Sequence, residues 1–100
     1  LDVPDVPTRE RVIVLSRPNP AAGSSAVSFV AARPGHVRAS VYDVAGRRVR
    51  ELLDREMPAG PVSLAWDGTG DDGVAVASGV YFVRVETPDG VGAAKVALVR

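Results

Sequence analysis

The side chains in this chain with the clearest potential for chemistry are three aspartates in a glycine-rich segment. Asp67, Asp71 and Asp72 lie within the run Asp-Gly-Thr-Gly-Asp-Asp-Gly. Carboxylate oxygens are the ligands that Ca²⁺ prefers, and glycine allows the backbone to wrap tightly around an ion. The spacing differs from the helix-flanked EF-hand loop, because glycine and threonine alternate with the acids and no glutamate closes the segment. We therefore favour a turn in which the aspartates cap backbone N–H groups, with a calcium loop as the alternative.

The single histidine, His36, gives no sign of a catalytic centre. It follows Pro34-Gly35 in a segment that reads as a turn. A nucleophilic triad needs a base beside a hydroxyl and an orienting acid, and a catalytic zinc usually takes about three protein ligands. The chain has one histidine and no cysteine, and Glu51, Glu56 and Glu86 fall on predicted strand or turn surfaces rather than in a cleft. We expect no enzyme activity, no catalytic residue and no cofactor.

The charge pattern also argues against nucleic acid and membrane as partners. The chain has 12 basic and 12 acidic residues and a formal net charge of zero. Its one basic cluster, 47–50, is followed at once by acids and contains no aromatic residue for base stacking. The longest apolar runs are far shorter than the roughly 20 residues that a membrane-spanning helix needs. We predict neither nucleic-acid binding nor membrane insertion.

The elements that would position these groups are all predicted to be strands. Ten glycines and eight prolines interrupt a valine-rich chain, which leaves no window for a long helix. The predicted strands cover 11–16, 25–32, 37–43, 47–54, 62–66, 79–87 and 92–100. This pattern predicts an all-β fold, an immunoglobulin-like antiparallel β-sandwich of about seven strands, over residues 11–100. Residues 1–10, with prolines at 4 and 7, are predicted to form an extended linker.

Alternation within the strands predicts which side chains face the core. Val27 and Phe29 alternate with polar residues, as do Val37 and Val41. The pattern slips between Val49 and the adjacent pair of leucines at 52–53, which predicts a bulge or an edge strand. The aromatic residues that could stack on carbohydrate are Phe29, Tyr42, Trp66, Tyr81 and Phe82. Most of them fall on inward positions, which disfavours carbohydrate binding.

Several short motifs occur in the order found in a known domain family. They are Pro18-Asn19-Pro20, the run 41–49 (Val-Tyr-Asp-Val-Ala-Gly-Arg-Arg-Val), Pro58-Ala59-Gly60, Trp66-Asp67-Gly68, Asp71-Asp72-Gly73, the run 77–84 (Ala-Ser-Gly-Val-Tyr-Phe-Val-Arg) and the closing run 95–100. Together they resemble the FlgD-like immunoglobulin domain and the similar type A C-terminal sorting domain of bacterial secreted proteins. The resemblance covers about residues 12–100. At 19–23 this chain reads Asn-Pro-Ala-Ala-Gly, where the family often reads Asn-Pro-Phe-Asn-Pro.

The resemblance implies a non-catalytic C-terminal module of a larger exported bacterial protein, acting in sorting or anchoring during type IX secretion. Its partners would be the upstream passenger of the same polypeptide and the secretion machinery, and its location the cell surface or the extracellular space, reached through the periplasm. Leu1 at the start and Arg100 at the end of a strand fit a C-terminal piece of a longer chain. A carrier would pair with an exposed edge, for which 47–54 and 92–100 are the predicted candidates.

A second interpretation stays open at this point. The same resemblance is compatible with an immunoglobulin-like spacer or an assembly and binding module. Such a module would be of the flagellar hook-cap type or an accessory domain of a secreted hydrolase.

Overall fold

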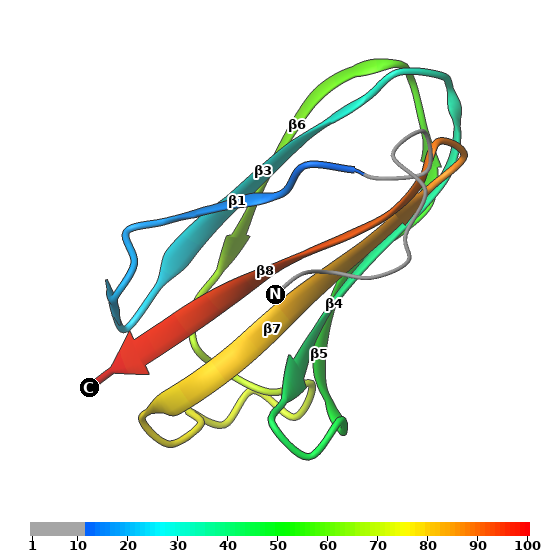
Figure 1. Cartoon of the computed structure of the whole chain (residues 1–100). Coiled ribbons are helices and arrows are strands. Elements are labelled where there is room, and N and C mark those ends of the chain that lie inside the picture. Colours follow the sequence, from blue (N-terminus) through cyan, green and yellow to red (C-terminus); the bar gives the residue numbers. More distant parts are fainter. Residues whose placement is uncertain (1–11) are drawn as a thin grey trace.

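The computed structural model describes residues 12–100, which form strands and loops with no helix among them (Figure 1). The strands are β1 (Leu15–Arg17), β2 (Ala21–Ala22), β3 (Ser25–Ala31), β4 (Gly35–Asp43), β5 (Arg48–Met57), β6 (Gly60–Trp66), β7 (Gly79–Thr87) and β8 (Gly90–Val99). The predicted linker, residues 1–10, lies outside the described residues. Within the described part of the chain, no helix is long and apolar enough to cross a membrane.

The strands form two sheets that pack face to face. One sheet has the order β1-β3-β6 and the other has the order β2-β8-β7-β4-β5. Every pairing between strands is antiparallel except that of β2 with β8, which is parallel. In Figure 1 the chain passes from β5 over one end of the molecule into β6, and so changes sheets there. The predicted all-β, immunoglobulin-like sandwich is confirmed, with eight strands rather than about seven.

The N-terminal strands differ most from the prediction. The first strand covers Leu15–Arg17 instead of 11–16, and the two-residue β2 was not predicted. Val12 and Val14 precede β1 but are buried, with exposed fractions of 7% and 8%. Their alternation with exposed residues therefore reflects packing on the core rather than membership of a sheet. A strand of two residues is too short to show any alternation, so β2 left no pattern in the sequence.

The core lies between the sheets and consists mainly of β-branched side chains. The predicted inward residues Val27, Val37 and Val41 are fully buried, as is Trp66. Burying a valine or a larger apolar side chain stabilises a fold by about 1.5–3 kcal/mol, so this row of alternating positions accounts for much of the driving force. The other core residues are Val12, Val14, Ala21, Phe29, Ala31, Ala39, Val62, Tyr81, Val83, Val85, Val96 and Leu98.

The predicted irregularity in β5 is present. The β4–β5 register shifts between Ala39 and Ser40 and again between Val41 and Tyr42. Leu52 and Leu53 are both half-buried, and two consecutive apolar residues can share one face only if the strand bulges between them. The strand also lies at the edge of its sheet, as predicted.

Candidate interaction surfaces

The Asp67–Gly73 loop is held by hydrogen bonds from its own aspartates. Asp67 Oδ1 accepts from the Thr69 N–H at 3.1 Å and from the Thr69 hydroxyl at 2.6 Å. Asp72 Oδ1 accepts from the Val74 N–H at 2.9 Å. The Thr69 hydroxyl, more than any other neighbour, lowers the pKa of Asp67 below its ordinary value. The capping turn that the sequence favoured is therefore what the structure contains.

Asp71 has a different role, because it bonds to a neighbouring strand. Its N–H donates to the Val49 carbonyl at 2.8 Å, and its Oδ1 accepts from the Glu51 N–H at 2.9 Å. Val49 and Glu51 belong to β5, whose other edge pairs with β4. One residue thus makes two of the hydrogen bonds that an additional strand would make to the outer edge of β5.

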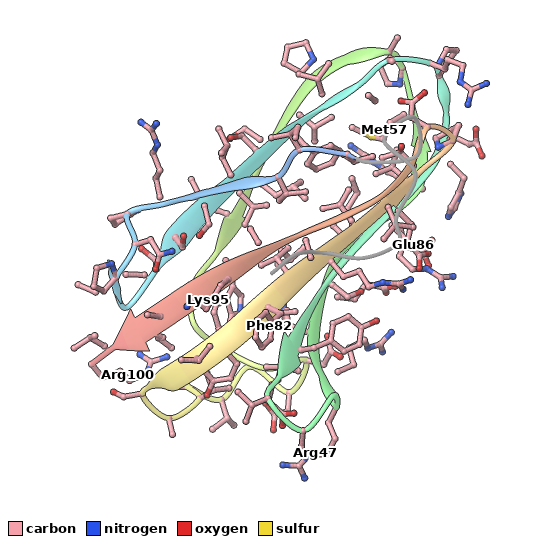
Figure 2. The ribbon with its side chains drawn as sticks, viewed as in Figure 1. Arg47, Met57, Phe82, Glu86, Lys95 and Arg100 are labelled. Carbon is pink, nitrogen blue, oxygen red and sulfur yellow. The ribbon has the colours of Figure 1, made fainter. Side chains whose placement is uncertain are left out.

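The basic cluster at 47–50 is neutralised by nearby acids. Arg47 Nε lies 3.1 Å from Asp43 Oδ2 at the β4–β5 turn, whose tip is labelled in Figure 2. Arg48 lies 3.4 Å from Asp71, and Arg50 lies 3.9 Å from Asp67. Each of these three arginines therefore has a carboxylate within 4 Å, so the positive charge at 47–50 is locally compensated.

The loop between β6 and β7 is anchored to the core and to the last residue. The Trp66 indole N–H donates to the Thr69 carbonyl at 2.8 Å, and the Tyr81 hydroxyl donates to the Ala77 carbonyl at 2.6 Å. The two rings meet edge to face with centroids 5.3 Å apart. The Arg100 guanidinium donates to the carbonyls of Val76 and Gly68. Trp66 is therefore a core residue with a satisfied N–H, and not a platform for a ligand.

The three loop aspartates do not converge on one point. Each carboxylate is directed to a different backbone N–H, and two of them also face arginines. Over residues 12–100, no three His, Cys, Asp or Glu side chains are arranged to hold a metal ion. The calcium alternative stays a prediction that a titration decides.

His36 is the second residue of β4 and not part of a turn, so its predicted position was wrong. The glycine before it already pairs with Met57, which extends the ladder to the end of both strands. The imidazole is exposed, with Nε2 2.5 Å from Asp54 Oδ1 and Nδ1 3.4 Å from Glu56 Oε2. The hydrogen bond to Asp54 raises the pKa of His36 and lowers that of Asp54. Both imidazole nitrogens thus face carboxylates and not a hydroxyl nucleophile.

The aromatic side chains follow the predicted inward pattern in three of five cases. Phe29, Trp66 and Tyr81 are buried. Tyr42 is half-buried, and Phe82 is 38% exposed on the outer face of the five-stranded sheet. Figure 2 shows Phe82 on β7 beside Lys95 on β8, and these two residues are register partners.

The outer edge of β8 is not free, which corrects the prediction for 92–100. β2 pairs with its end at Leu98 and Val99. Nearer the start of β8, Asn19 forms two hydrogen bonds with the strand edge, as Asp71 does with the edge of β5. Its Nδ2 donates to the Lys95 carbonyl at 2.9 Å, and its Oδ1 accepts from the Ala97 N–H at 3.0 Å. Asn19 belongs to the Pro-Asn-Pro motif, so the motif has a structural role in covering this edge.

An apolar groove of about 1030 Å³ lies along the three-stranded sheet. Its lining includes Ile13, Leu15 and Val30, which are 66%, 51% and 62% exposed, together with Pro61 and Ser63 of β6. Ile13 and Leu15 alternate with the buried Val12 and Val14, and Val30 lies between the buried Phe29 and Ala31, so these apolar side chains occupy outward-facing positions.

Comparison with known proteins identifies the family. The description FlgD Ig-like domain matches residues 17–90, which is most of the chain. The chain belongs to the FlgD Ig-like domain family. A comparison with curated proteins gave no match.

Solved structures agree with membership of the FlgD Ig-like family. Dimeric latent PorU from Porphyromonas gingivalis is 26% identical with a TM-score of 0.64, and the match covers 86% of this chain and 9% of PorU. FlgD from Xanthomonas campestris, a hook-capping protein of flagellar assembly, is 30% identical with a TM-score of 0.59, covering 84% of this chain and 60% of FlgD. FlgD from P. aeruginosa is 27% identical with a TM-score of 0.58, and the match covers 72% of this chain and 57% of that FlgD.

This FlgD Ig-like chain spans only part of each of these relatives. The share is largest for the Xanthomonas FlgD, at 60%, and smallest for PorU, at 9%. The domain therefore occurs in parents of very different length, and the activity of a parent cannot be transferred to it. The family and the fold inferred from the sequence motifs are both confirmed.

Proposed function

We propose that this domain is a non-catalytic C-terminal module of a larger exported bacterial protein and acts as its sorting or anchoring domain. The observation that supports the proposal best is the likeness to a small part of PorU, in which a domain of this size accompanies a far longer chain. Its partners would then be the passenger of the same polypeptide and the secretion machinery. The protein would be found at the cell surface or outside the cell.

The polar chemistry of the described residues is consistent with a module that does not catalyse a reaction. The aspartates of the β6–β7 loop accept hydrogen bonds from backbone N–H groups, and two of them also face Arg48 and Arg50 of β5. His36 is held between Asp54 and Glu56 on an exposed strand surface. A catalytic base normally needs a nucleophile within hydrogen-bond reach and some exclusion of water. Among residues 12–100, the groups that His36 contacts are carboxylates, and its imidazole is exposed.

Export of a reporter tests the proposed sorting role. A folded reporter is fused in front of residues 1–100 and expressed in a host with a type IX system, with the reporter alone as control. We expect the fusion to be recovered from the surface or the medium and the reporter alone to stay inside. A matched fusion carrying Val83→Asp, which places a charge at a fully buried position, should lose export if the machinery reads the folded sandwich.

A fusion that stays inside the cell while the domain is folded would rule out sorting. The second candidate, an assembly or spacer module, would then take its place. It is supported by the 30% identity to a hook-capping protein over 84% of this chain. Co-purification of the domain with its parent's assembly partners, with export unaffected by its deletion, is the result expected of that candidate.

A further inference from the structure

The two sides of the sandwich are closed to different degrees. On the β8 side, β2 and Asn19 cover the edge of the five-stranded sheet. The segment before β1 also reaches this side, because the Val12 N–H donates to the Val91 carbonyl at 3.3 Å. On the opposite side lie the outer edges of β5 and β6. In the described part of the chain, Asp71 covers β5 at Val49 and Glu51, and no comparable contact covers β6.

Among the described residues 12–100, β6 has a neighbouring strand on one side only. It pairs with β3 from Ser25 opposite Trp66 to Ala31 opposite Gly60, and within residues 12–100 no other backbone or side-chain group bonds to its main chain. Proline is tolerated in a strand where the missing N–H would face away from the neighbouring strand. Pro61 therefore identifies the alternate residues of β6 whose backbone groups point away from β3. Ser63 and Ala65 follow Pro61 at every second position, so their N–H and C=O groups also point away from β3, to the free edge.

The seam between β5 and β6 also leaves core side chains incompletely covered. Leu53 pairs with the fully buried Ala39 and so shares its inward face, yet it is only half-buried. Leu64 and Met57 are likewise half-buried, although each packs against the core. Met57 lies at the end of β5 where the chain turns toward β6 (Figure 2). A row of half-covered apolar side chains next to an unpaired edge matches what one additional strand would bury.

A cation lies on the same seam. Arg55 pairs with Val37, which is fully buried, so Arg55 is on the inward-facing side of β5. Its side chain is nevertheless exposed, and no carboxylate of residues 12–100 lies within ion-pair distance of it. The neighbouring arginines of β5, Arg48 and Arg50, each face an aspartate. Arg55 therefore supplies a positive charge that a ligand on the seam could pair with.

We propose that the β6 edge and the β5–β6 seam form a docking site for an extended segment of a partner polypeptide. The segment pairs antiparallel with β6 through Ser63 and Ala65. Its alternate side chains are apolar and cover Leu53, Met57 and Leu64, and one of them is acidic and meets Arg55. This inference does not depend on the export role.

The chemistry distinguishes this occupant from two others. A second copy paired through its own β6 would bring the sequence Gly-Pro-Val-Ser-Leu-Ala-Trp, which has no acid to meet Arg55. The chain's own first ten residues contain prolines at 4 and 7, and proline lacks the N–H that a ladder needs. A separate polypeptide with alternating apolar residues and one acid satisfies both the edge and the charge.

A designed peptide tests the site on the full chain. The probe has about nine residues, a typical strand length, with valine at inward positions, threonine between them and one inward glutamate. Bound to ¹⁵N-labelled protein, it should shift the amide signals of Ser63 and Ala65 most. Ser63→Pro removes an edge N–H at an exposed position and should weaken binding at least tenfold, whereas Ser63→Thr keeps the N–H and should leave binding unchanged.

Charge reversal provides a second, independent variant on the surface. Arg55→Glu should weaken binding of the glutamate peptide severalfold and strengthen binding of a peptide with lysine in its place. Thermal unfolding of each variant reports whether it is folded. The proposal is overturned if the peptide fails to bind at millimolar concentration, or if Ser63→Pro binds it as tightly as the unsubstituted chain does. It is also overturned if sedimentation shows self-association through β6 that excludes the peptide.

Discussion

Gly92 of β8 allows the segment before β1 to pack against the sheet, and its replacement tests that packing directly. A Cβ placed on Gly92 would lie 1.9 Å from the Val12 carbonyl oxygen and 3.0 Å from Val14 Cγ2. Real Cβ atoms essentially never approach other heavy atoms more closely than 3.0 Å. In Gly92→Ala the Val12 carbonyl therefore has to withdraw by roughly 1 Å from a close-packed site.

The cost of this withdrawal has two bounds. Forcing extra volume into a packed site typically costs about 1–3 kcal/mol. Complete release of the segment would instead lose the burial of Val12 and Val14, each worth about 1.5–3 kcal/mol before the entropy regained is counted. We expect Gly92→Ala to destabilise the domain by about 2–3 kcal/mol, which lowers the Tm by roughly 10–20 °C for a domain of this size.

Thermal and urea unfolding, followed by circular dichroism, measure this loss. Ala93→Val is the control, because it enlarges an exposed side chain of the adjacent residue and should change stability by less than about 0.5 kcal/mol. The mechanism is tested in a chain that begins at Leu15, where nothing remains to clash with the new methyl group. There Gly92→Ala should cost less than about 1 kcal/mol, since alanine is otherwise better than glycine within a strand. An equal loss in both chains, or no loss in the full chain, would refute the close-approach argument.

Four other measurements examine the polar contacts. Asn19→Ala opens the edge of β8, so we expect a loss of about 1–2 kcal/mol and concentration-dependent association in sedimentation velocity, while an unchanged monomer would contradict the covering role. The raised pKa of His36 means that its stabilising bond to Asp54 is present below the unfolded value near pH 6.5 and is lost as pH rises through the folded value. The lowered pKa of Asp54 means that the stability contributed by its ionised carboxylate is lost as pH falls through the acidic range. His36→Gln should therefore flatten the Tm–pH profile in the near-neutral region where His36 titrates, and leave the acidic part in place. Ser40 is 2% exposed and its hydroxyl has no hydrogen-bond partner among residues 12–100, so Ser40→Ala should leave stability unchanged or raise it by about 1 kcal/mol, and a clear loss would show that the hydroxyl is bonded. Millimolar Ca²⁺ should leave the Tm unchanged if the Asp67–Gly73 loop is held only by its own caps, whereas a rise would support the calcium alternative.

Asn19 and Asp71 each form hydrogen bonds with the outer edge of a strand of the five-stranded sheet. An unpaired strand edge invites pairing with other chains, and a single residue that both donates and accepts can occupy it without adding a strand. Asn19 uses its amide and Asp71 uses its own N–H with its carboxylate. Both residues lie in short motifs by which the sequence resembles the FlgD Ig-like family, and in this chain both motifs cover edges of the same sheet. Among residues 12–100, no side chain covers the edge of β6 in this way.

Local chemistry in the sequence was enough to predict the fold and much of the loop. Valines at alternate positions specified the inward faces of β3, β4 and β7, because a strand presents successive side chains to opposite faces. The slip at the leucines of β5 predicted its bulge, and the spacing of aspartate and glycine predicted a capped turn at 67–73. These features depend on neighbours only a few residues apart, so they are visible in the chain itself.

The order of the strands was decided only by the tertiary structure. That order also determines which strand edges are paired and which are not. Asn19 lies 76 residues from the Lys95 carbonyl that it bonds, and Asp71 lies 20 residues from Glu51. The sequence predicted edges at 47–54 and 92–100. The first is an edge strand, but β2 and Asn19 cover the second, and over residues 12–100 β6 is an edge that the sequence did not predict. An edge is defined by the absence of a neighbour, and which strands become neighbours depends on how the whole core packs rather than on the residues of the strand itself.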